Sequence, residues 1–396
     1  MQVIDRQKAL SIPPIFRLGF RPLFLGAALF ALLAIPLWLI SMHTGSGFLH
    51  PTGGWMAWHR HEMPFGFGLA VIGGFLLTAV QNWTGQPGLS GRPLAALAGV
   101  WLAARIGWLA GLPAAWLLPL ELAFPLLVSA AMARILWSVR MTRNYPVVGV
   151  LGLLAAADAL SVIGVMRSDD GLQRQGALAA LWLIAGIVTL IGGRVIPFFT
   201  LRGLRRPGNV SPTPRLDNAL LGGAVLMAVL EATGAGLSPH PLIGAVLLAL
   251  AAGHGVRLWR WFDRGIKDVP LLWSLHLAYA WLPVACLGLA GWHAAAGWNP
   301  SLPLHALTVG TIGGLILAMM ARVSLGHTGR DLEPPRGMAA AFALLQAGAA
   351  CRVFVAGVWP VWGWWLAGAC WTAAFGVFAW RYAPMLWSAR VDGHPG

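Results

Sequence analysis

Residues 57–81 read A-W-H-R-H-E-M-P-F-G-F-G-L-A-V-I-G-G-F-L-L-T-A-V-Q, an apolar segment that begins with two histidines and a glutamate. A predominantly apolar run of about 20 residues is long enough to cross a bilayer as a helix. Ionisable side chains are costly inside a membrane and usually serve a function there, so His59, His61 and Glu62 are candidate functional residues. The alternative is that these side chains only occupy the headgroup region at the end of the helix.

The composition of the whole chain is typical of a polytopic helical membrane protein. Of its 396 residues, 58% are hydrophobic and only 10% are charged, and the formal net charge is +14. Soluble domains are far more polar, and no polar stretch here is long enough to form one. The basic residues fall in alternate short loops, so membrane topology explains the positive charge and a nucleic-acid partner is not expected.

Hydropathy predicts an all-α protein with twelve transmembrane helices, which form one integral membrane domain over residues 1–396. The approximate cores of these helices are 18–41, 57–81, 93–111, 114–137, 146–166, 174–197, 216–235, 240–262, 270–292, 302–321, 338–357 and 362–384. Arginine and lysine are concentrated before the first helix and after the fourth, sixth, eighth and tenth. By the positive-inside rule, these loops and both termini are cytoplasmic.

Two sequence markers recur in the same order three times along the chain. The triplet I-G-G occurs, at intervals of about 120 residues, at 72–74, 191–193 and 312–314. In the helix after each triplet, a charged residue stands eight positions before a proline: Arg105, Glu231 and Arg352. We therefore predict three four-helix repeats, over about 18–137, 146–262 and 270–384. The alternative is a chance match in a chain that has 50 glycines.

Histidines supply the candidate metal and haem ligands, because imidazole suits copper, iron and zinc and commonly holds haem iron. An outer group lies near the outer ends of two helices that the repeat makes equivalent: His59, His61 and His305. His254 and His276 lie in the inner halves of their helices and form a second group. His327 lies in the loop after the tenth helix. For each of them, the structural alternative is a hydrogen-bonded core histidine.

Spacing limits how His59 and His61 can act together. Two residues apart on a regular helix, their side chains point about 200° apart, so they cannot easily share one ion. Either one histidine faces the bundle interior as a ligand and the other orients it as a neighbouring group, or the helix is unwound at this point. Glu62 could orient a ligand or carry protons, and we assign it the catalytic role.

Charged residues in other helices predict a polar interior. Arg105 and Arg352 lie within predicted helices, and an arginine near a haem can bind a propionate through two hydrogen bonds. Arg105 could equally form a structural ion pair with Glu231. For Glu121 and Asp158 we favour a structural role.

Five motifs of this chain resemble those of the NnrS family of bacterial inner-membrane proteins. They are H-x-H-E-M (59–63), G-F-L-L-T-A-V-x-N-W-T-G (74–85), G-G-R-V-I-P-F-F-T (192–200), L-W-S-L-H-L-A-Y-A-W (272–281) and H-A-L-T-V-G-T-I-G-G…M-x-R-V-S-L-G-H-T-G-R (305–330). Proteins of that family contain haem and copper and are linked to nitric oxide stress and denitrification. The resemblance implies haem b, with copper as a second candidate cofactor, in a protein that handles nitric oxide. It also implies that the motif histidines bind these cofactors: His59, His61, His276, His305 and His327.

Twelve helices in three groups of four are also similar in outline to the core of the haem–copper oxidases and nitric oxide reductases. In that superfamily, haem ligands come from the second and tenth helices, and here His59 or His61 and His305 occupy the same two helices. This is an analogy of fold, and fold does not fix function. The dense histidine pattern of that superfamily on helices six and seven is missing, which puts common descent in doubt.

Three functions follow as hypotheses. The first is a nitric oxide reductase-like oxidoreductase that receives electrons from a quinol or a cytochrome c. The second is a haem-based binder, which sequesters nitric oxide or protects against it without turnover. The third is a secondary transporter, because twelve helices with Gly and Pro breaks also fit that class.

Overall fold

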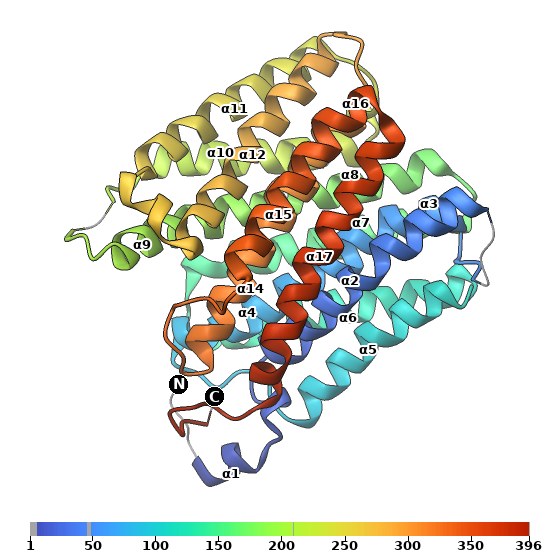
Figure 1. Cartoon of the computed structure of the whole chain (residues 1–396). Coiled ribbons are helices and arrows are strands. Elements are labelled where there is room, and N and C mark those ends of the chain that lie inside the picture. Colours follow the sequence, from blue (N-terminus) through green and yellow to red (C-terminus); the bar gives the residue numbers. More distant parts are fainter. Residues whose placement is uncertain (1–5, 46–48, 209, 396) are drawn as a thin grey trace. The chain divides into compact units, whose positions relative to one another are not determined.

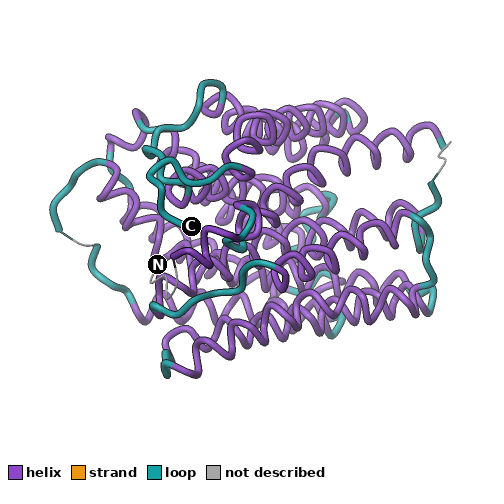
Figure 2. Tube along the Cα trace, turned by 90° about the horizontal axis from the view of Figure 1, so that it is seen from below, coloured by secondary structure: helices purple, strands orange, loops and turns teal. Residues whose placement is uncertain are grey.

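The computed structural model describes residues 6–45, 49–208 and 210–395, and these residues are mostly helical (Figure 1). No strand occurs among them, and short loops join the helices (Figure 2). Inside a bilayer, backbone polar groups find no water, and a helix satisfies them within its own segment. The predicted all-α class is therefore confirmed.

Every predicted segment coincides with helix. The long helical segments are α2 (Phe20–Thr44); α3 (Gly54–His61), η2 (Glu62–Gly68) and α4 (Leu69–Thr84); α5 (Arg92–Leu109); α6 (Ala114–Ser138); α7 (Tyr145–Met166); α8 (Asp170–Ile187), η4 (Val188–Gly192) and α9 (Gly193–Gly203); α10 (Pro214–Ala232); α11 (Pro241–Trp261); α12 (Pro270–His293); α13 (Ser301–His305), η7 (Ala306–Gly313) and α14 (Gly314–His327); α15 (Met338–Ala350), η8 (Cys351–Val355) and α16 (Ala356–Val358); and α17 (Pro360–Trp387). Short helical turns complete the structure: α1 (Arg6–Ser11), η1 (Pro14–Phe16), η3 (Thr142–Asn144), η5 (Ala235–Leu237) and η6 (Arg264–Asp268).

Within the described residues, ten of these segments are long and apolar enough to cross a membrane. Helices α5 and α10 are not among the ten. Each carries charged residues in its interior or first turns, such as Arg105 in α5 and Asp217 in α10. The chain is thus a multi-pass helical membrane protein, while twelve crossings stay a prediction.

Four of the long segments contain a π-helical stretch: η2, η4, η7 and η8. Such stretches are rare and often mark functional sites, because the wider turn leaves the regular ladder of backbone hydrogen bonds. Three of them occur in the segments that carry the I-G-G triplets. This is the pattern that three related repeats would produce, although the repeats themselves stay a prediction.

The chain folds as two compact units. The first comprises residues 1–180, 323–333 and 378–396, and the second comprises residues 181–322 and 334–377. In the first unit, α2 packs on α4, and α6 packs on α4, α5 and α7. In the second unit, α12 packs on α11 and α15, and η7 packs on α12 and α15.

The first unit ties its two chain ends together through Arg21, at the start of α2. This side chain is fully buried, and its guanidinium donates hydrogen bonds to the carbonyl oxygens of Leu386, at 3.0 Å, and Ser388, at 2.6 Å. Those carbonyls belong to the end of α17, where a helix has no backbone donors of its own left to bond them. Arg21 therefore caps the last helix.

Candidate functional site

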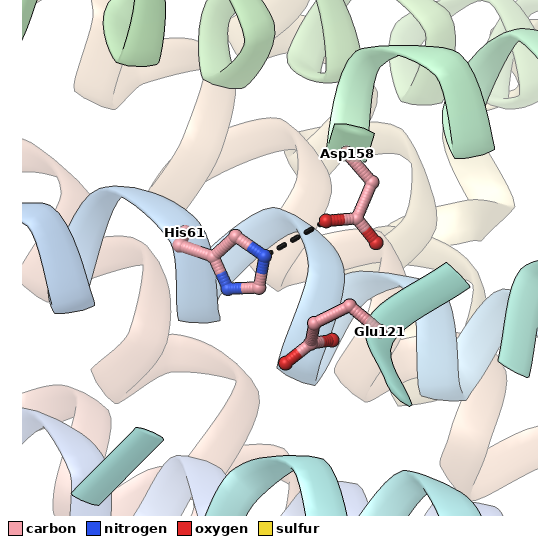
Figure 3. Close-up of side chains that lie close together, drawn as sticks. All are labelled: His61, Glu121 and Asp158. Atoms are coloured by element: carbon pink, nitrogen blue, oxygen red, sulfur yellow. Dashed lines mark hydrogen bonds and ion pairs between the residues drawn. The ribbon is translucent and has the colours of Figure 1, made fainter. Parts of the chain in front are cut away.

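His61 lies at the centre of a buried polar cluster in the first unit. It is the last residue of α3, and its side chain is not exposed at all. Its Nε2 atom lies 2.8 Å from Oδ1 of Asp158 on α7, and its Nδ1 atom lies 3.3 Å from Oε1 of Glu62 (Figure 3). Its ring stacks on Trp108 of α5, with the centroids 4.3 Å apart. Both ring nitrogens of His61 therefore face carboxylates.

Arg105 links a third carboxylate to this group. Its Nε atom lies 2.9 Å from Oε2 of Glu62, and its Nη2 atom pairs with Glu121 of α6. Trp108 donates its indole N–H to Oε1 of Glu121 at 2.5 Å. The structure thus gives Arg105 two acidic partners, Glu62 and Glu121, which corrects the pairing with Glu231 considered from the sequence. We call these six residues the His61 cluster: His61, Glu62, Arg105, Trp108, Glu121 and Asp158.

The charges of the His61 cluster do not balance. Three carboxylates face one guanidinium, so with neutral His61 the fully ionised cluster has a net charge of −2. A buried charge without a partner is costly. In addition, Oδ2 of Asp158 is buried and has no hydrogen-bond partner among the residues that the structure describes. The cluster therefore favours an added cation, which is either a metal ion or protons.

Three members of the His61 cluster have the geometry of a metal site. His61, Glu121 and Asp158 each offer one ligand atom, and these atoms all lie within 4.8 Å of one another. Figure 3 shows their side chains, from α3, α6 and α7, pointing toward one another. One imidazole and two carboxylates suit divalent ions such as Zn²⁺, Cu²⁺, Fe²⁺ or Mn²⁺. A metal here would replace the hydrogen bond between His61 and Asp158.

The π-helical stretch η2 fixes the position of Glu62. Trp101 of α5 donates its indole N–H to the carbonyl oxygen of Gly66 at 2.8 Å, which holds η2 against α5. A Cβ atom at Gly66 would lie 2.7 Å from Oε2 of Glu62 and 2.9 Å from Nη1 of Arg105. Only glycine lets the helix backbone approach the ion pair this closely.

His59 does not join the His61 cluster. It is half-buried, and its ring stacks on Trp38 of α2 with the centroids 4.2 Å apart. The two histidines of the H-x-H motif therefore contact different neighbours. His327, also in the first unit, has its ring 5.6 Å from that of Phe20.

In the second unit, His305 and Arg352 meet at one serine. Nδ1 of His305 lies 2.6 Å from the carbonyl oxygen of Ser301, and Arg352 donates to the hydroxyl of Ser301 at 2.8 Å. An imidazole that donates from Nδ1 carries its lone pair on Nε2, the atom that can bind a metal. The structure thus brings together two residues that the sequence marked as haem contacts.

His254 and His276 have separate partners in the second unit. Nδ1 of His254 lies 2.7 Å from the hydroxyl of Tyr279, and Nε2 of His276 lies 2.9 Å from the hydroxyl of Thr200. Both histidines are at least 95% buried. Each therefore has the contacts of a hydrogen-bonded core histidine.

Comparison with known families places these sites in context. Residues 14–390 match the family described as NnrS protein. The chain belongs to the NnrS family. No curated protein matches it. Membership indicates a membrane protein related to nitric oxide, in a family associated with haem and metal binding, and the matched range includes both the His61 cluster and the pair His305 and Arg352.

For this NnrS-family chain, sequence reasoning missed the grouping of Glu121 and Asp158 with His61. The sequence favours a structural role for both acidic residues, whereas in the structure they lie beside the candidate histidine. The available signal was one acidic residue in each of two successive apolar helices, α6 and α7. The local sequence pattern does not predict which residue of another helix such an acidic residue contacts.

Proposed function

We propose that this protein binds nitric oxide and reduces it at a haem b held by His305, and that the His61 cluster binds a second cation. The observation that carries the proposal is the meeting of His305 and Arg352 at Ser301. A histidine with its Nδ1 hydrogen bonded to a carbonyl is oriented to ligate iron through Nε2.

Arg352 fits the acidic edge of a haem. Among the described residues, no carboxylate pairs with this guanidinium, which donates a hydrogen bond to the neutral hydroxyl of Ser301. A cation in a membrane helix needs a counter-charge. A haem propionate would supply it, because guanidinium and carboxylate form two parallel hydrogen bonds.

Haem iron binds nitric oxide and can transfer single electrons to it. Reduction of two nitric oxide molecules to nitrous oxide and water consumes two electrons and two protons. Glu62 is the candidate proton donor, because its carboxyl contacts both His61 and Arg105 inside the membrane segment. The electrons would come from a quinol or a cytochrome c.

The metal that the His61 cluster would hold is a divalent ion. Copper is the candidate, because it is the second cofactor that the resemblance to the NnrS family implies. His61, Glu121 and Asp158 would be its ligands, and the indole N–H of Trp108 would orient Glu121. Hydrogen bonds of this kind to ligand side chains tune metal affinity. We place the protein in the bacterial inner membrane with both termini in the cytoplasm.

A haem-based binder without turnover is the alternative, and Glu62→Gln separates the two. The purified protein would be supplied with nitric oxide and an electron donor without oxygen, and nitrous oxide would be measured. Reduction predicts that Glu62→Gln still binds nitric oxide but produces little nitrous oxide, while the exposed Glu333→Gln behaves as wild type. Wild-type turnover no faster than that of free haem would reject reduction.

A secondary transporter stays a weaker candidate. The π-helical break between α3 and α4 beside buried charges fits the discontinuous helices that bind coupling ions in such proteins. Transport would be favoured if the purified protein contains no haem and moves a substrate into vesicles in which it is reconstituted.

A further inference from the structure

Two of the three tyrosines in the chain are fully buried, and their hydroxyl groups have opposite surroundings. Tyr382 stacks on Phe378, with ring centroids 4.5 Å apart, and its hydroxyl has no hydrogen-bond partner among the described residues. The Tyr279 hydroxyl lies 2.7 Å from Nδ1 of His254 and 3.3 Å from Nη1 of Arg257. Within the part of the chain that the structure describes, one buried phenol thus lies beside a base and the other does not.

The direction of the Tyr279–His254 hydrogen bond follows from Arg257. A guanidinium can only donate, so the oxygen of Tyr279 accepts from Arg257. Among the described residues, Nδ1 of His254 is the acceptor that lies within hydrogen-bond distance of this hydroxyl. We therefore assign the phenolic hydrogen to that bond, which makes His254 neutral with its own hydrogen on Nε2.

The surroundings hold this geometry in place. Arg257 donates to Oδ1 of Asp217, at 2.5 Å and 3.1 Å, and to the carbonyl oxygen of Thr189 in η4, at 2.9 Å. A Cβ atom at Gly193 would lie 3.0 Å from Nη2 of Arg257, so the helix that follows η4 also confines the guanidinium. Asp217 neutralises Arg257, and the Tyr279–His254 pair therefore lies beside an ion pair of no net charge.

An aromatic neighbour extends the group. The ring of Trp261, at the end of α11, lies 4.9 Å from that of Tyr279, and Trp261 is 94% buried. Trp261 is thus the aromatic neighbour through which an electron could leave Tyr279. His254 is a separate acceptor for the proton.

We propose that Tyr279 is a redox-active tyrosine whose phenolic proton is accepted by His254. An oxidised transition-metal centre removes one electron from the ring, the O–H bond of Tyr279 breaks, and the proton bonds to Nδ1 of His254. The products are a neutral tyrosyl radical, an imidazolium ion and the metal centre reduced by one electron. Tyr382 has no base, so the same oxidation there would leave a buried radical cation, which is costly.

The test oxidises the full-length protein in detergent with hexachloroiridate(IV), a one-electron oxidant, and records electron paramagnetic resonance on frozen samples. Ring-deuterated tyrosine separates a tyrosyl signal, which narrows, from signals of the 22 tryptophans. We expect a tyrosyl radical in the wild type and an undiminished one in the double variant Tyr145→Phe/Tyr382→Phe. In Tyr145→Phe/Tyr279→Phe the yield should fall at least about tenfold relative to Tyr145→Phe alone, since Tyr382, the remaining phenol, has no base to take its proton.

His254 is tested through the hydrogen bond that it makes to the radical. An exchangeable-proton hyperfine coupling, seen by comparing H₂O with D₂O, should be present in wild type and absent in His254→Leu. His293→Gln, a change at another buried histidine, on α12, keeps a hydrogen-bond acceptor and should leave the coupling intact.

Two results would overturn the proposal. One is the absence of a tyrosyl signal in the wild type or in Tyr145→Phe/Tyr382→Phe; the other is a signal in Tyr145→Phe/Tyr279→Phe as strong as that of Tyr145→Phe. The variant Tyr145→Phe/Tyr382→Phe, in which Tyr279 is the remaining tyrosine, decides the question even if Tyr279→Phe does not fold. The oxidant is supplied externally, so the outcome does not depend on whether the protein reduces nitric oxide.

Discussion

Nε2 of His61 lies 2.8 Å from Oδ1 of Asp158, and neither side chain is more than 1% exposed. The two residues come from α3 and α7 and meet beside Glu121, which makes a nitrogen and two carboxylates available at one point. A buried group of this composition is stable only when its charges are balanced.

Asp158→Asn should weaken metal binding, because it removes one ligand charge and alters the acceptor that His61 faces. We expect metal content after loading with copper(II) or zinc to fall at least about tenfold, in the range seen when a supporting group of a metal site is lost. Elemental analysis of the purified protein measures this. Ser161→Ala is the matched control, since the buried hydroxyl of Ser161 lies one turn further along α7 and has no hydrogen-bond partner in the described part of the chain. Equal metal in both variants and wild type would argue against the site.

Gly66→Ala should destabilise the protein, because the new Cβ atom would lie 2.7 Å from Oε2 of Glu62. Overpacking of a buried position costs about 1–3 kcal/mol, so the melting temperature in detergent should fall. Gly99→Ala, in α5, has nothing within 4 Å of its new Cβ atom and should be neutral or slightly stabilising. If the Gly66→Ala protein is as stable as Gly99→Ala, the close contact between the backbone at Gly66 and the Glu62 side chain is not needed for stability.

Arg21→Met should loosen the end of α17. It removes the donors for the carbonyls of Leu386 and Ser388. The buried Leu386 carbonyl left unpaired costs about 1–3 kcal/mol. Limited proteolysis should therefore cleave the C-terminal tail faster in this variant. Arg381→Met changes an exposed arginine of α17 and should leave the cleavage rate unchanged. No difference between the two variants would show that the cap is dispensable.

Arg206 should control the acid titration of Asp263 in the loop after α11. Hydrogen bonds from the Arg206 guanidinium and the Gly265 N–H hold the pKa of Asp263 below its usual value. A lowered carboxyl pKa contributes stability above the unfolded-state pKa, and that stability is lost as pH falls through the folded-state pKa. Arg206→Ala should therefore raise the pKa of Asp263, as followed by carbon NMR of labelled aspartate, whereas Arg205→Ala should not. An unchanged titration would show that the pair does not form in solution.

The sequence was enough to predict the helices but not their contacts. Apolar runs such as 57–81 fix helix positions because a membrane segment must satisfy its backbone within itself. The charge of Arg105 within α5 was visible, yet its partners Glu62 and Glu121 come from other helices, and pairing across helices leaves no local pattern. The π-helical stretches were also not predicted, because they depend on tertiary contacts such as that between Trp101 and Gly66. For the same reason, the meeting of His305 and Arg352 at Ser301 needed coordinates, although both residues were candidates.

The most direct test of the account is the haem content of the purified protein, measured by its optical spectrum and by extraction of the haem. We expect haem b in wild type, little or none in His305→Ala, and a reduced amount in Arg352→Gln, while a change at the exposed His43→Ala has no effect. Full haem content and an unaltered spectrum in His305→Ala would contradict the proposal that His305 holds the haem.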